Sequence, residues 1–255
     1  MATSDFYSFV LAILGAAVAG LVGGFALMRH MTLAGDVISH VALPGLGLAL
    51  LFEFNPLLGG AATLFLGTIL IWQLQKKSGL ATETTIGVIF AASVAIGTLV
   101  TPEEDLIDAL FGGFLKLNFM EFAIGLVAVI LIAIFISRFK NRLVLGLFSP
   151  DLAISSGINL SRMNLYFLLI FSLTVILGLQ FLGALLVGAL IIIPAATARN
   201  LTHDLKKFLW LSALVSIVSV LVGYLASAYL NLDLGPSIIS VASVMFGLTL
   251  IGKQV

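Results

Sequence analysis

The stretch "GDVISHVALPG", from Gly35 to Gly45, places an acid and an imidazole four residues apart in a chain that is otherwise almost entirely apolar. Positions i and i+4 share one face of a helix, so a helix here would present Asp36 and His40 together. A carboxylate and an imidazole suit zinc, manganese or ferrous iron better than calcium or sodium. Two ligands from one helix do not fill a coordination sphere, so other helices, water or a second copy of the chain would have to supply the rest. A sphere left open in this way suits a site that must release its ion.

The spacing alone leaves three interpretations of this pair open. In the first, Asp36 caps a helix at the membrane interface and His40 is an ordinary packed histidine. In the second, the two residues form a proton relay. In the third, they are ligands to a divalent metal ion. An ionisable group near the hydrocarbon costs about 2.5–3.5 kcal/mol on insertion scales.

Pro44 follows His40 by four residues. It has no N–H and it clashes with the carbonyl four residues earlier, so the helix should kink or unwind beside the histidine. Broken helices that line a substrate path recur in transporters. The depth of the pair stays open. Counting spans puts Asp36 near the cytoplasmic mouth, whereas a midplane site would need the helix to begin earlier, around His30.

The composition sets the class of protein. Of the 255 residues 61% are hydrophobic and 9% are charged, against about 25% charged in a soluble domain. We therefore expect an all-α polytopic membrane protein, with residues 1–255 forming a single transmembrane domain embedded in membrane lipid. The absence of cysteine excludes disulfides and thiolate metal sites. A net charge of zero without a basic run argues against nucleic acid as a partner.

Runs of 17–25 mostly apolar residues predict membrane-spanning helices. Nine such runs are present, and the sixth and seventh are joined so tightly around "LQFLG" that one bent segment, giving eight, is the competing interpretation. The nine are Phe6–Met28, Asp36–Glu53, Leu57–Gln75, Thr84–Thr101, Asn118–Ser137, Leu165–Phe181, Leu182–Ala198, Phe208–Leu230 and Pro236–Ile251.

The charges of the loops predict the orientation. Lysine and arginine gather in cytoplasmic loops, and eleven of the twelve in this chain fall on one side of the nine-span arrangement, with Lys116 the exception. This alternation requires both the sixth and the seventh segments to cross. We therefore expect the N-terminus outside and the C-terminus in the cytoplasm. The outer loop at residues 101–114 is acidic and would attract cations.

Four stretches of the chain resemble the membrane subunit of ABC-type zinc/manganese/iron importers. "GDVISHVALPG" is similar to the family signature G-D-x-x-S-H-x-x-L-P-G, and "LGALLVGALIIIPAATAR" to its G-x-L-L-V-x-A-L-L-I-x-P-A-A-T-A segment. "ETTIGVIFAASVAIG" resembles the E-x-x-I-G-x-x-F run. "SPDLAISSGI" resembles the cytoplasmic D-x-x-x-A-x-x-x-G region, although Asp151 and Ala153 are only two positions apart. The resemblance covers nearly the whole chain.

The resemblance implies a function. The chain would be the permease subunit of an ATP-driven importer, with a divalent metal ion as substrate and no permanently bound cofactor, in the inner (plasma) membrane of a prokaryote. Asp36 and His40 match the positions proposed to coordinate the passing metal. Glu83, Asp108, Glu121 and His203 are other possible ligands, which we interpret as interfacial charges.

The lack of an ATP-binding motif bears on the energy source and on the partners. The sequence contains no phosphate-binding G-x-x-x-x-G-K-[ST] loop, so we expect ATP hydrolysis on a separate cytoplasmic subunit and no enzymatic activity in this chain. The family resemblance further implies an extracytoplasmic metal-binding protein and two copies of the permease.

The longest cytoplasmic connection, residues 138–164, should carry the coupling to the ATP-binding subunit. Pro150 suits the first turn of a short helix with Ser149 as its cap. The residues that we expect to couple are Pro150, Asp151, Leu152, Ala153 and Gly157.

Two functions of other classes are compared with this one. An ion- or proton-coupled secondary transporter would move its substrate without an ATPase. An intramembrane enzyme would need a catalytic signature, and the sequence has neither H-E-x-x-H nor G-x-S-x-G.

Overall fold

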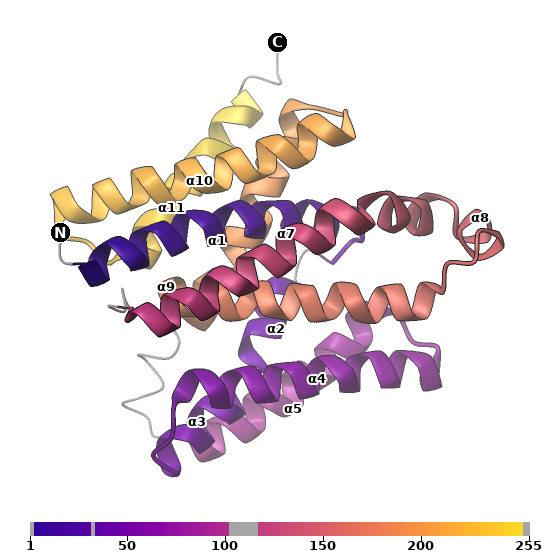
Figure 1. Cartoon of the computed structure of the whole chain (residues 1–255), viewed down its shortest axis with the longest axis horizontal. Helices are drawn as coiled ribbons and strands as arrows, with labels where there is room; N and C mark the ends of the chain where they lie inside the picture. The colour runs from indigo at the N-terminus through magenta and orange to yellow at the C-terminus, as the bar shows by residue number, and fades with distance from the viewer. Residues whose placement is uncertain (1–2, 32–33, 102–116, 252–255) are drawn as a thin grey trace.

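The computed structural model describes residues 3–31, 34–101 and 117–251, and every regular element in these ranges is a helix. Eight segments of the described chain are long and apolar enough to cross a membrane. The expected helical membrane bundle is therefore confirmed (Figure 1). The helices are α1 (Thr3–Met28), α2 (Ala34–His40), α3 (Leu43–Leu51), α4 (Pro56–Ser78), α5 (Thr82–Val100), α7 (Phe119–Phe148), α8 (Pro150–Ser155), α9 (Leu160–Leu201), α10 (Leu205–Leu230) and α11 (Leu234–Ile251).

Polar side chains fix where several of these helices begin. The side chain of Asn118 accepts from the backbone N–H of Glu121, and the carboxylate of Glu121 accepts from the N–H of Asn118, both at 2.9 Å. This reciprocal capping box satisfies two donors that the first turn of α7 would otherwise leave unpaired. Asn55 caps α4 by accepting from the N–H of Leu57 at 2.9 Å.

The basic residues gather at one end of the bundle, as the loop charges predict. Arg29, just after α1, donates to Asn164 of α9, and Asn164 donates to Gln75 near the end of α4. Gly24 of α1 packs against Phe208, near the start of α10. The end of α1 therefore lies beside the end of α4 and the starts of α9 and α10. Five cations adjoin these contacts in sequence, namely Lys76, Lys77, Arg162, Lys206 and Lys207.

Helix α9 is continuous for 42 residues but is sharply bent. A side chain on Gly178 would overlap a methyl group of Val187, although residues nine apart on a straight helix are separated by about 13.5 Å. Figure 1 shows the arm that begins at the basic end, beside α8, and the second arm that returns toward the start of α10. We favoured two separate spans joined at "LQFLG", with one bent segment as the competing interpretation. The helix runs through this sequence without a break, as one bent segment. Because the second arm of α9 returns to the basic end, Arg199 lies on the same side as the other lysines and arginines, as the alternation of loop charges predicts.

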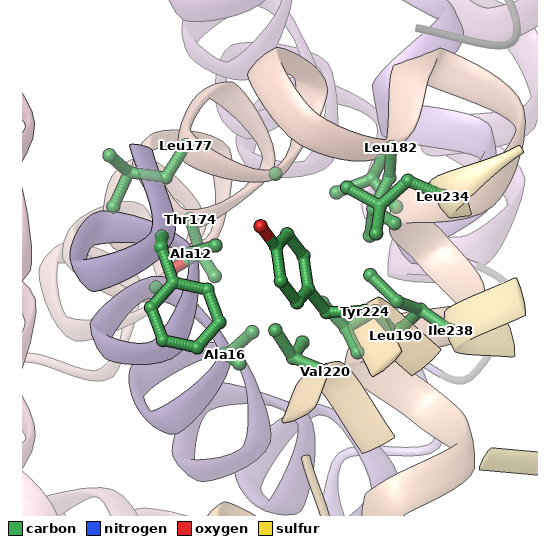
Figure 2. Close-up of a pocket in the computed structure, with 15 residues that line it drawn as sticks. Ala12, Ala16, Thr174, Leu177, Leu182, Leu190, Val220, Tyr224, Leu234 and Ile238 are labelled. Carbon is green, nitrogen blue, oxygen red and sulfur yellow. The ribbon is translucent and has the colours of Figure 1, made fainter. Parts of the chain in front are cut away.

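The bend of α9 lies against the middle of α1. Leu177 and Leu182, on either side of the bend, line a small cavity of about 20 Å³ together with Ala12 and Ala16 of α1. Figure 2 shows Tyr224 of α10 projecting into the centre of this group. The cavity has room for about one water molecule.

Helix α7 is longer than the sequence predicted. We expected the fifth span to end at Ser137, but α7 continues for three more turns to Phe148. Its middle carries an exposed apolar stripe, Ile124, Val127, Leu131 and Ile134, at the spacing of one helical face. Such a face suits contact with lipid. The extra turns place α8 beyond the ends of the neighbouring helices in Figure 1.

Candidate metal-binding site

The second predicted span is broken beside His40. Helix α2 ends at His40 and α3 begins at Leu43. Between them, the N–H of Val41 donates to the carbonyl of Ile38 at 3.0 Å and that of Ala42 to Ser39 at 3.2 Å, which is the tighter three-residue pattern. Pro44 lies in the first turn of α3 and has no N–H to offer the carbonyl of His40. The interruption predicted from Pro44 is therefore confirmed.

A contact between two glycines holds α2 against α9. A Cβ atom on Gly188 would overlap the backbone nitrogen of Asp36 and lie 2.7 Å from its Cα atom. A Cβ atom on Gly35 would lie 3.0 Å from the Cα atom of Gly188. Small residues allow helices to approach this closely in a membrane. The backbone that carries Asp36 thus rests directly on the second arm of α9.

This contact places the pair within the bundle. Gly188 follows Val187, which touches Gly178 across the bend of α9, and the bend lies beside the middle of α1. Asp36 is therefore at the level of the bend, away from the basic end where Arg29 lies. His30 and Met31 are not helical, so this depth is reached without a helix that starts at His30.

The orientation of His40 prepares one ring nitrogen for a metal ion. Its Nδ1 atom lies 2.8 Å from the backbone carbonyl oxygen of Asp36. A carbonyl can only accept, so Nδ1 carries the proton and Nε2 keeps its lone pair. This is the usual arrangement of a metal-bound histidine, whose other N–H donates to a fixed acceptor. The ring also meets Phe90 of α5 edge to face, at 5.5 Å between centroids.

Ser39 is a neighbour that the sequence analysis did not assign to the site. It is fully buried, and its hydroxyl donates to the same carbonyl of Asp36 at 2.6 Å. Its Oγ atom lies 3.4 Å from Nδ1 of His40. Ser39 therefore helps to fix the acceptor that orients the imidazole. The signal in the sequence was its place between the two candidate ligands, as the serine of the G-D-x-x-S-H signature.

One chain supplies an incomplete site. The side chain of Asp36 is exposed and that of His40 is partly exposed. Within the described ranges, no group of three or more His, Cys, Asp or Glu residues lies close enough to hold a metal ion. The pair therefore sits on an open face of α2 with room for ligands from elsewhere.

The other candidate ligands lie apart from this pair. Glu83 is exposed in the first turn of α5, and His203 is exposed between α9 and α10. Glu121 belongs to the capping box of α7. Asp108 and the rest of the acidic loop at 102–114 lie outside the described residues, as does Lys116.

The predicted coupling segment forms the short helix α8. Pro150 occupies its first turn as expected. Ser149 stands at the cap position, but its side chain makes no capping hydrogen bond, so this detail of the prediction is wrong. Its backbone N–H instead donates to Leu145 and closes α7.

The surface of α8 is mixed in character. Leu152 and Ile154 are each 60% exposed, whereas Ala153 is buried against the bundle. Asp151 is exposed, and Gly157, with φ of 76°, turns the chain back toward α9. This φ is a left-handed conformation that glycine adopts without strain.

Comparison with known proteins identifies the family. Residues 6–253 match the model of the ABC 3 transport family. The chain belongs to this family. The resemblance found in the sequence motifs is thereby confirmed, and the chain is a membrane-spanning permease of the ABC type.

Relatives of this permease include the manganese transport system membrane protein MntC of Listeria innocua, which is 30% identical over 233 residues, 90% of this chain and 83% of the relative. The high-affinity zinc uptake system membrane protein ZnuB of Haemophilus influenzae is also 30% identical, over 91% of each chain. Among solved structures, PsaBC from Streptococcus pneumoniae in complex with Fab matches with a TM-score of 0.81 and 27% identity, over 95% of this chain and 89% of that one.

Proposed function

We propose that this permease imports a divalent transition metal, manganese, zinc or iron, and that the ion passes between Asp36 and His40. The observation that carries the proposal is the hydrogen bond from Nδ1 of His40 to the carbonyl of Asp36, which leaves Nε2 free to bind a metal. Relatives of 30% identity are named for manganese transport and for zinc uptake. The ligand set does not select between these metals.

A second copy of the chain would complete the coordination sphere. Helix α5, whose Phe90 touches His40, presents an exposed row of small side chains at one-face spacing: Thr84, Gly87, Ala91, Ala95 and Thr98. A Cβ atom on Gly87 would meet no atom within 4 Å. Such a row lets another helix approach closely. Two copies facing each other here would bring two Asp36 carboxylates and two His40 imidazoles toward one ion.

Helix α8 is the proposed contact with a cytoplasmic ATP-binding subunit. It projects at the basic end of the bundle, which the positive-inside bias assigns to the cytoplasm (Figure 1). Exposed Leu152 and Ile154 offer an apolar surface beside Asp151. ATP hydrolysis would then occur on the partner, and this chain would have no catalytic role. On the opposite side, an extracytoplasmic metal-binding protein would deliver the ion, in the inner membrane of a prokaryote.

Reconstitution tests this function against a secondary transporter. Proteoliposomes that contain the permease and its ATP-binding subunit should accumulate manganese or zinc against a gradient only when ATP and the metal-binding protein are supplied. Permease alone, under a proton or sodium gradient, should accumulate no metal. Uphill uptake by the permease alone would refute the ATP-driven mechanism and support the ion-coupled alternative.

A further inference from the structure

Arg29 is a partly buried cation at the basic end of the bundle, just after the span that ends at Met28. One of its N–H groups donates to Oδ1 of Asn164 at 2.8 Å, and its guanidinium lies 4.4 Å from the centre of the Phe167 ring. Neither neighbour carries a negative charge. Burial lowers the pKa of Arg29 to about 10, so that it remains a cation at neutral pH. Within the described ranges, no carboxylate forms an ion pair with it.

The hydrogen bonds around Arg29 end in a further unpaired donor. Because arginine only donates, Asn164 must turn its oxygen to Arg29 and its amide nitrogen to Oε1 of Gln75, at 2.8 Å. This arrangement fixes Gln75 with its Nε2 atom on the other side. That atom is buried and has no acceptor among the described residues. The cluster therefore has an excess of donors and of positive charge.

A pocket of about 240 Å³ opens beside this cluster. Arg29, Thr82 and Asn164 supply its polar wall. Met31, Leu160 and Met163 supply an apolar wall. A buried cation without a counter-ion is costly, and a bound anion would offset that cost. The two walls together suit a ligand with an anionic head and a hydrocarbon part.

The surroundings place this pocket at the level of a membrane interface. Trp72 of α4 donates its indole N–H to the backbone oxygen of Ser161 at 3.0 Å, one turn before Asn164, and Lys76 lies 5.5 Å from the Trp72 ring. Tryptophan and lysine are typical of the headgroup region. Basic pockets between spanning helices on the cytoplasmic side bind lipid headgroups. Glu83 follows Thr82 in sequence but is exposed and forms no ion pair with Arg29.

We propose that this pocket binds the phosphate of an anionic phospholipid from the cytoplasmic leaflet, with Arg29 as the cation that holds it and the apolar wall in contact with its acyl chains. The site is separate from Asp36 and His40, which lie at the level of the α9 bend. A variant that loses lipid binding can therefore keep metal binding, and the reverse, so the two proposals are tested separately.

Native mass spectrometry of the delipidated full chain in detergent tests this site. Phosphatidylglycerol, phosphatidylcholine and inorganic phosphate are titrated separately, and the shift in the thermal unfolding midpoint is measured in parallel. We expect phosphatidylglycerol to bind and to stabilise the wild-type chain, and Arg29→Gln to weaken this binding at least tenfold. Arg199→Gln, which removes an exposed arginine at the end of α9, should leave it unchanged.

A second variant keeps the proposal testable if Arg29→Gln does not fold. Asn164→Asp replaces the amide oxygen that Arg29 already contacts with a carboxylate oxygen. The side chain of Gln75 can then turn so that its amide nitrogen donates to this carboxylate. This variant should fold, should unfold at no lower temperature than the wild type, and should lose the response to phosphatidylglycerol because the cation has an internal counter-ion.

Three results would overturn the proposal. The first is equal affinity of the wild type and both variants for phosphatidylglycerol. The second is stabilisation by inorganic phosphate as large as that by the lipid, which would indicate a free-anion site. The third is that Arg29→Gln loses the ATP-binding subunit on co-purification while its lipid binding is intact, which would indicate that a carboxylate of that partner occupies the pocket.

Discussion

The Nδ1 atom of His40 lies 2.8 Å from the main-chain carbonyl oxygen of Asp36, the residue one helical turn before it. The turn of helix that aligns the two side chains also fixes the tautomer of the imidazole. The Nε2 atom is left as an acceptor, and the Asp36 carboxylate is exposed on the same helix. Helix α2 therefore presents two candidate metal ligands on one face, and the imidazole of His40 is oriented before any ion arrives.

Replacement of either ligand should abolish transport. We expect His40→Ala and Asp36→Ala to reduce manganese or zinc uptake to the level of cells without the permease. Each variant removes one of the two ligands that a single chain contributes. Expression and membrane insertion should be normal, since neither side chain is buried. His203→Ala, which changes an exposed histidine between α9 and α10, is the matched control and should transport like the wild type. Uptake near the wild-type rate in the His40 variant would refute the assignment of His40 as a metal ligand.

Gly188 should be required for the position of α2. A methyl group there would overlap the backbone of Asp36, and overpacking of this kind costs about 1–3 kcal/mol. We expect Gly188→Ala to lower metal uptake at least tenfold. Gly247→Ala on α11 adds the same methyl group where no atom lies within 4 Å, and it should have no effect. Metal uptake by cells that produce equal amounts of each variant measures the difference; full activity of Gly188→Ala would contradict the close packing of α2 on α9.

The row of small residues on α5 should govern self-association. Gly87→Leu adds a large side chain to an open position, so the single chain should fold normally. We expect the variant to shift from dimer to monomer in light scattering of the detergent-solubilised permease, with loss of metal uptake. Gly247→Leu is a control of the same chemistry on another helix. A Gly87→Leu chain that stays dimeric and active would show that the second copy binds elsewhere.

Exposed apolar residues on α8 should transmit the signal from ATP hydrolysis. Replacing Leu152 and Ile154 together by serine leaves the buried Ala153 untouched. We expect the reconstituted complex to hydrolyse ATP without metal transport, or to lose the partner on purification. Leu201→Ser, at an exposed leucine at the end of α9, should preserve coupling. Undiminished transport by the α8 variant would eliminate this helix as the coupling element.

Local chemistry explains the parts of the structure that the sequence predicted. Pro44 necessarily removes a hydrogen bond from its helix, and α2 and α3 are separated beside it. Pro150 favours a first helical turn, and α8 begins there. The spans follow from hydrophobic length, which is a property of the single segment.

Features that depend on distant contacts were not predictable in this way. A bent segment at "LQFLG" was the competing interpretation of the sequence, but how far the two arms of α9 fold back depends on the meeting of Gly178 with Val187. The depth of Asp36 depends on Gly188, far along the chain. Arg29 and Asn164, 135 positions apart, show no mutual pattern in the sequence. Their only signal was a polar residue near the end of each span.

X-ray absorption spectroscopy of the metal-loaded complex tests the central claim most directly. A tag-free permease with its ATP-binding subunit, loaded with zinc, should show imidazole nitrogen at about 2.0–2.1 Å together with carboxylate oxygen. The imidazole signal should disappear in His40→Ala while oxygen ligands remain. A spectrum with only oxygen ligands, or an imidazole signal that survives His40→Ala, would contradict the assignment of Asp36 and His40 as the metal site.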